Sequence, residues 1–207
     1  MSDARTAVPT TAVLGFRPHT YWTAAVALAG DPHAPQVLER RRIDFASGDE
    51  RGVYHHVEGM DPGEAQAWID RVWATVEVNC RRGLGALLED LDKAGVTLGV
   101  AVVPIARARP PDKLEEILKS HSWMHAAEGD FYRGAVAAAC TALGLEVRRG
   151  VERDFSAEVC RRHAFPAALL DMRMKSLGAA LGPPWSEDQK LATLAAWSQL
   201  GEAVAEG

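Results

Sequence analysis

The chain has 207 residues, with 23 basic and 28 acidic side chains and a formal net charge of −5, and its hydrophobic (47%) and charged (25%) fractions are those of a globular protein. A chain of this size is expected to bury roughly 70% of its unfolded surface, which is enough for one sizeable core. The mild acidity argues against a dedicated, strongly basic nucleic-acid binder, although not against a local basic stripe. No apolar run approaches the roughly 18 residues of a membrane span, and the first residues lack the apolar stretch of a secretory signal.

The cysteines indicate a reducing compartment. Cys80, Cys140 and Cys160 are odd in number and far apart, so neither a disulfide framework nor a cysteine-type zinc site is expected. Cys80 and Cys140 lie in helical patterns and are predicted to be core residues. We therefore expect a cytoplasmic protein. The usage of 35 alanines, with 18 arginines against 5 lysines, is typical of a high-GC bacterial genome.

The first third of the chain predicts an antiparallel meander. Residues 1–10 are expected to be a polar, disordered tail. Apolar runs then predict two short strands over 11–16 and 21–29, joined by a short connection. Residues 36–46 alternate polar and apolar side chains, which predicts a third strand with one wet face at the edge of a sheet.

The middle of the chain predicts a long helix and a buried strand, after a polar loop over 47–60. Asp61 as cap, Pro62 in the first turn and Glu64 mark the start of a helix that ends at Ala94, with Gly83 and Gly85 as points where it can bend or break. The nearly continuous apolar run 96–104 predicts a strand buried on both faces.

The last part of the chain predicts alternating helices and one more strand. Asp112 and Glu115 have capping-box spacing and predict a helix that reaches Leu143. A further strand is predicted over 145–153. The remaining predicted elements are helices over 156–164, 166–181 and 186–200, the last of them with a capping box formed by Ser186 and Gln189. We expect one α/β domain over 11–200, a tail over 201–207, and a mixed sheet of three antiparallel strands followed by βαβ crossovers.

This element order, the first hairpin (VLGFRPHTYWTAAVAL, 13–28) and the alanine-rich last helix (SEDQKLATLAAWSQL, 186–200) resemble the ribonuclease H-like superfamily, which includes the RuvC-type nucleases and the actin-like ATPases. The resemblance implies a ribonuclease H-like fold, with metal ions or phosphates held near the end of the first strand. It also implies that Asp188 corresponds to the late acidic metal ligand of the family.

Two departures weigh against metal-dependent catalysis of the family's kind. Arg17 stands where the first-strand aspartate is expected, and the predicted strand 96–104 carries no acid. Two-metal phosphoryl transfer needs several carboxylates that converge on two cations. A nuclease or an actin-like ATPase is therefore disfavoured, and the resemblance implies a protein that keeps the fold while binding a nucleic acid, a nucleotide or another phosphate-bearing ligand.

Two groups of basic residues are candidates for that ligand. Arg17, His19 and Thr20 in the first strand connection offer a guanidinium, an imidazole and a hydroxyl for a phosphate, and the alternative is an ordinary exposed turn. A second candidate is a basic stripe for nucleic acid, with edge protection and solvated faces as the alternative. Its members are Arg40, Arg41, Arg42, Arg148, Arg149 and Arg153.

The segment SHSWMHAAEGDFY (120–132) holds a third candidate site. At 100° per residue, His121, His125, Glu128 and Tyr132 share one stripe of the predicted helix, together with residues expected to pack on the core.

Three interpretations of this stripe stay open. The stripe forms a structural hydrogen-bond network, or a functional pocket in which Glu128 and a histidine act as base and acid, or a divalent-metal site. About 10.5 Å of helix rise separates His121 from Glu128, so one ion would hardly bind both. Further ligands would come from elsewhere, with His55, His56 and Glu58 as candidates. The alternative function is thus an enzyme that uses the His121/His125/Glu128 face of the helix, either with or without a metal ion.

Overall fold

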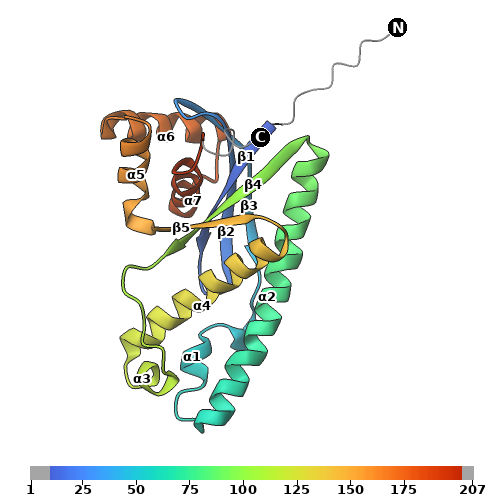
Figure 1. Cartoon of the computed structure of the whole chain (residues 1–207), viewed down its shortest axis with the longest axis vertical. Coiled ribbons are helices and arrows are strands. Elements are labelled where there is room, and N and C mark those ends of the chain that lie inside the picture. The colour runs from blue at the N-terminus through green and yellow to red at the C-terminus, as the bar shows by residue number, and fades with distance from the viewer. Residues whose placement is uncertain (1–9, 202–207) are drawn as a thin grey trace.

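The computed structural model describes residues 10–201, and the chain forms a five-stranded mixed sheet covered by helices on both faces (Figure 1). The predicted tails lie outside the described residues, except that Thr10 begins the first strand and Gly201 belongs to the final turn. The strands are β1 (Thr10–Pro18), β2 (Trp22–Asp31), β3 (Ala34–Asp44), β4 (Val96–Ile105) and β5 (Glu146–Val151). The helices of the described residues are α1 (Val53–His56), α2 (Pro62–Lys93), α3 (Leu114–Leu118), α4 (His121–Ala142), α5 (Phe155–Arg162), α6 (Ala167–Leu181) and α7 (Glu187–Trp197).

The strand order is β3-β2-β1-β4-β5, with β1, β2 and β3 antiparallel and β1, β4 and β5 parallel. The predicted meander, the edge position of β3 and the parallel crossovers are therefore confirmed. Because β1, β4 and β5 run in the same direction, their carboxyl ends meet at one edge of the sheet. Open α/β sheets bind ligands outside such ends.

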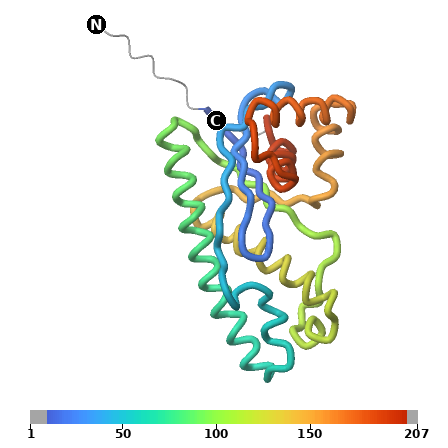
Figure 2. Tube along the Cα trace, turned by 180° about the vertical axis from the view of Figure 1, so that it is seen from behind, coloured from blue at the N-terminus to red at the C-terminus, as the bar shows by residue number. Residues whose placement is uncertain are grey.

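Alternation of side chains along the strands divides the core into two layers. Leu14 and Phe16 of β1 pack with α2 and α4 on one face, whereas Val13 packs with α5, α6 and α7 on the other. Figures 1 and 2 show the long α2 and the oblique α4 on one side of the sheet and the three C-terminal helices on the opposite side. This two-sided burial is what a sheet with parallel crossovers requires.

The long helix α2 begins and ends where its sequence predicts. The Asp61 side chain accepts hydrogen bonds from the backbone N–H groups of Gly63 and Glu64. The helix continues through Gly83 without a break. A Cβ on Gly83 would lie 2.5 Å from Ile43 Cγ2, so glycine is needed here for the close approach of α2 to β3, not for a bend.

Two predictions about local structure are wrong. The helix predicted up to Leu143 is two helices, because α3 ends before Ser120 and Ser120 caps α4 by accepting a hydrogen bond from the N–H of Trp123. Asp112 caps nothing, since α3 begins after Lys113. The segment 47–60 is also more ordered than predicted and contains a short 3₁₀ turn and α1.

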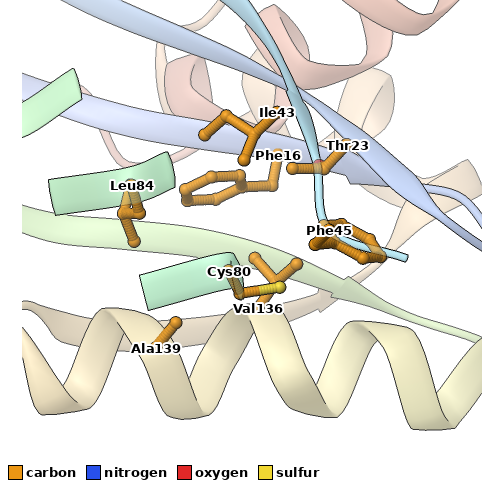
Figure 3. Close-up of a pocket in the computed structure, with 8 residues that line it drawn as sticks. All are labelled: Phe16, Thr23, Ile43, Phe45, Cys80, Leu84, Val136 and Ala139. Carbon is orange, nitrogen blue, oxygen red and sulfur yellow. The ribbon is translucent and has the colours of Figure 1, made fainter. Parts of the chain in front are cut away.

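A small void lies inside the core between the sheet, α2 and α4 (Figure 3). Its volume is about 10 Å³, its walls are almost entirely apolar, and the Thr23 hydroxyl beside it donates to the Ala24 carbonyl. A cavity of this size holds one water molecule at most, and apolar walls offer it no partners. The void is thus a packing defect and not a ligand site.

Cys80 and Cys140 are buried and unpaired, which confirms that both are core cysteines. Among the described residues, no helix has the length and apolar character needed to cross a membrane.

Candidate functional site

The carboxyl end of β1 presents Arg17 and His19, and each contacts an acidic side chain. Arg17 lies within β1, not in the connection after it, and its Nε is 3.2 Å from Glu152 Oε2. That contact is ionic without hydrogen-bond geometry, because Nε has no hydrogen-bond partner while Nη1 donates to the Pro18 carbonyl. The Arg17 charge is therefore matched by Glu152.

His19 connects the first hairpin to the last helix. Its Nε2 donates to Asp188 Oδ1 over 2.7 Å, and its ring stacks on Trp22 at 4.4 Å between centroids. Asp188 is in the first turn of α7, where its charge also suits the helix dipole. Thr20 is exposed in the same connection.

These residues do not fit a two-metal carboxylate site. Asp188 lies near the end of β1, as the resemblance implies, yet it is engaged by His19. Arg17 brings a positive charge to the carboxyl end of β1, and β4 carries no acid. Pairs of divalent cations need several free carboxylates.

Arginines gather at the neighbouring carboxyl ends of β4 and β5. Two adjoining pockets, of about 460 and 260 Å³, share the segment 105–107 and Arg133 as walls. The arginines that line them are Arg107, Arg109, Arg133, Arg149 and Arg153, and the acids are Asp130 and Glu152. We call this pair of pockets the arginine cleft. It carries a net positive charge in a chain whose net charge is −5.

The inner wall of the arginine cleft carries the charges of Arg133 and Arg149, which Asp130 only partly balances. Arg133 Nη1 donates to Asp130 over 3.0 Å, but its buried Nε has no hydrogen-bond partner. Burial, together with the nearby charge of Arg133, lowers the pKa of Arg149 from its ordinary value, although Asp130 opposes this shift. An anion in the cleft would favour the charged form of Arg149.

The basic stripe suggested by the sequence does not form as one surface. Arg40 donates to the carbonyls of Leu181 and Gly182 and thereby holds the end of α6. Arg41 pairs with Asp90, and Arg42 pairs with Asp44. Of the later arginines, Arg148 pairs with Glu146, whereas Arg149 and Arg153 line the arginine cleft.

The four stripe residues of α4 fall into two groups. Glu128 and Tyr132 are buried, at 3% and 1% exposure, and the Tyr132 hydroxyl donates to the Glu50 carbonyl. Burial raises the pKa of Tyr132 above its ordinary range, with the charge of Glu128 as a second cause. His121 and His125 are exposed, so the expectation that all four face the core is wrong.

A residue from outside α4 completes the cluster. His55 of α1 donates through Nδ1 to Glu128 Oε1 over 2.6 Å, and its Nε2 lies 3.3 Å from His121 Nδ1. His121 Nε2 is 3.0 Å from His125 Nε2. We call His55, His121 and His125 the histidine cluster. The sequence offered His55, His56 and Glu58 without preference, and no signal in it distinguishes His55.

The comparisons with known proteins report only a likeness in structure. No protein-family model and no curated protein matches the sequence. Thermus thermophilus RuvC in complex with a Holliday junction substrate matches with a TM-score of 0.52 and 11% identity, over 91% of this chain and 92% of that one. Another structure of Thermus thermophilus RuvC gives a TM-score of 0.46 and 12% identity over the same shares.

This likeness, together with the strand order, defines the class: the chain is a single α/β domain with a ribonuclease H-like fold. Within that fold the arginine cleft lies at the carboxyl ends of β4 and β5, and the histidine cluster lies between α1 and α4.

Proposed function

We propose that this protein binds nucleic acid through the arginine cleft. The observation that carries the proposal is the set of five arginines, against two carboxylates, around adjoining pockets at the carboxyl ends of β4 and β5. Guanidinium groups bind phosphate oxygens in a bidentate manner and keep their charge at every accessible pH. Parallel α/β sheets place their ligands at this edge.

The shape of the arginine cleft suits a phosphodiester chain better than a free nucleotide. Its two pockets adjoin and are open to solvent, and arginines line both of them. Phosphate contacts of this kind fix a nucleic acid in place without reading its sequence. The RuvC structure of the same fold holds a Holliday junction substrate, which supports nucleic acid as the ligand class.

We propose further that binding is not coupled to hydrolysis at the β1 edge. Arg17 and the Asp188–His19 pair leave no set of free carboxylates there for two cations. The alternative of an enzyme that uses the α4 face depends on one observation, the convergence of His55 on His121 and His125, and it requires the metal site treated below.

The test measures binding of fluorescein-labelled single-stranded, duplex and branched DNA by anisotropy over a series of salt concentrations. Arg107→Glu/Arg109→Glu is expected to weaken binding at least tenfold and to reduce the salt slope by about two, because each lost phosphate contact releases one counterion fewer. Arg109 is highly exposed and Arg107 lines the rim, so the fold should tolerate both changes.

The matched control is Arg81→Glu/Arg82→Glu on the exposed face of α2, which changes the net charge equally outside the cleft. It should bind with nearly wild-type affinity. Equal losses in both double variants would mean that only the overall charge matters, and absence of binding by wild-type protein at low salt would refute the proposal.

A further inference from the structure

We propose that the histidine cluster binds one transition-metal ion, with Zn²⁺ as the preferred ion. His55, His121 and His125 are the ligands, and Glu128 is the positioning residue. This site is separate from the ion pairs at the end of β1 and uses none of the residues of the arginine cleft.

The three histidine rings converge closely enough to share one tetrahedral ion. Zinc bound to imidazole at about 2.0–2.1 Å separates neighbouring ligand nitrogens by about 3.3 Å. One nitrogen from each of the three rings lies within 4.8 Å of the others. His121 meets His55 through Nδ1 at 3.3 Å and His125 through Nε2 at 3.0 Å, so an ion bound to a single His121 nitrogen requires a rotation of the exposed His121 or His125 ring.

Two elements far apart in the sequence supply the ligands. His121 and His125 stand one turn apart at the start of α4, which is the spacing at which two imidazoles on one helix share an ion. His55 comes from α1, which packs against α4 at this point. The three rings lie with centroids 4.5 to 4.9 Å apart.

Glu128 supplies the outer carboxylate that metal-binding histidines usually have. Its Oε1 accepts from His55 Nδ1 over 2.6 Å and from the His55 backbone N–H over 3.4 Å. This bond fixes the His55 tautomer, so the lone pair of Nε2 faces the other two histidines. The Glu128 side chain is only 4% exposed, and a buried carboxylate with a histidine as its main partner is costly unless it serves a positive charge nearby.

The donor set also selects the class of ion. Three neutral imidazoles suit zinc, copper, nickel and cobalt, whereas magnesium and calcium prefer oxygen ligands. Three protein ligands leave a fourth position for water. The His125 side chain is 61% exposed, so solvent reaches this end of the histidine cluster. A water bound there would have a lowered pKa and would be a nucleophile for hydrolysis.

The test uses tag-free protein freed of metal with a chelator and then titrated with Zn²⁺ in competition with a chromophoric chelator. We expect one tight site per chain. Co²⁺ should give the visible absorption of a four-coordinate site, and saturating Zn²⁺ should raise the Tm by several degrees.

Variants assign the ligands. His121→Ala and His125→Ala replace exposed side chains, so both should fold normally and lose the tight site. Glu128→Gln should keep the site but weaken it 10- to 100-fold, the range typical of outer carboxylates. His33→Ala removes an exposed histidine elsewhere and should bind like the wild type.

Wild-type protein that binds no Zn²⁺ or Co²⁺ more tightly than His121→Ala would overturn the proposal. So would equal losses in His33→Ala and His125→Ala. The Arg107→Glu/Arg109→Glu variant should retain full metal binding, so failure of this site and failure of nucleic-acid binding are distinguishable.

Discussion

At the carboxyl end of β1, each of two basic side chains contacts an acidic one. The Nε atom of Arg17 lies 3.2 Å from Glu152 Oε2. His19 donates a hydrogen bond to Asp188. These side chains of the described residues therefore engage one another across three elements of the fold.

The pair of His19 and Asp188 supports a prediction at this scale. Asp188→Asn is expected to lower the free energy of unfolding by about 1 kcal/mol, because it weakens a charge-assisted hydrogen bond and removes a charge from the start of α7. Thermal and urea unfolding with and without Mg²⁺ would measure this. Mg²⁺ should stabilise neither protein, and stabilisation of the wild type alone would identify Asp188 as a metal ligand after all.

The sequence alone pointed to some residues of the histidine cluster and the arginine cleft but not to others. His121, His125 and Glu128 were found because they share a helix, where spacing fixes direction. His55 could not be ranked above its neighbours, because its contact with Glu128 depends on how the loop after β3 packs on α4. Of the arginine cleft, only Arg149 and Arg153 were candidates, because the other arginines come from the β4–α3 connection and from α4.

Among the elements, the starts of α2 and α7 were predicted correctly from local signals, whereas the capping-box spacing of Asp112 and Glu115 was misleading. Asp61 and Ser186 cap their helices as their neighbours in sequence imply. The break between α3 and α4 was missed because apolar residues continue at helical spacing across Ser120, while Ser120 itself acts as a cap. The mixed sheet was predicted from the alternation of elements, whereas the order of its strands was not.

The packing of α7 against β1 depends on the absence of a side chain at Gly15. A Cβ there would lie 2.0 Å from the Ala192 carbonyl oxygen and 2.5 Å from the Ala196 nitrogen, both in the backbone of α7. Gly15→Ala is therefore expected to destabilise the protein by about 3 kcal/mol or more, since backbone must move. Urea unfolding would measure this loss.

Gly99→Ala in β4 is the matched control, because nothing lies within 4 Å of a Cβ at that position. This change should be neutral or slightly stabilising. A similar loss of stability in both variants would show that glycine matters for the strands in general and not for the contact with α7.

At the scale of the whole molecule, the core contains groups that resist ionisation. Burial raises the pKa of Cys140 to about 12 and raises that of Cys80 still further. Burial also raises the pKa values of Tyr132 and Tyr54. Each of these groups stays neutral in the folded chain at a pH where the unfolded chain has lost the proton.

Stability should therefore fall on the alkaline side. The contribution of these groups to the free energy of unfolding is fully present below their ordinary pKa values, which are 9.0 for a thiol and 10.0 for a phenol. This contribution is lost as the pH rises from there toward the pKa values of the folded chain, because the unfolded chain then binds fewer protons than the folded one.

Urea unfolding under reducing conditions at pH 7 to 10 would test this, with a level profile below pH 8.5 and a decline above about pH 9 as expected outcomes. Cys140→Ala should flatten the decline, and Cys160→Ala, at a less buried position, should not. A level profile up to pH 10 would contradict the prediction.

The packing of α7 against the sheet has a consequence for the synthesis of the protein. The first two strands to leave the ribosome, β1 and β2, are the ones against which this late helix packs, and Val13 and Leu28 belong to its core layer. Until residues 187–197 have been made, one face of the sheet has no cover there. A nascent chain halted before that point would expose an apolar surface suited to chaperones and proteases, so translation must pass α7 before the domain can complete its core.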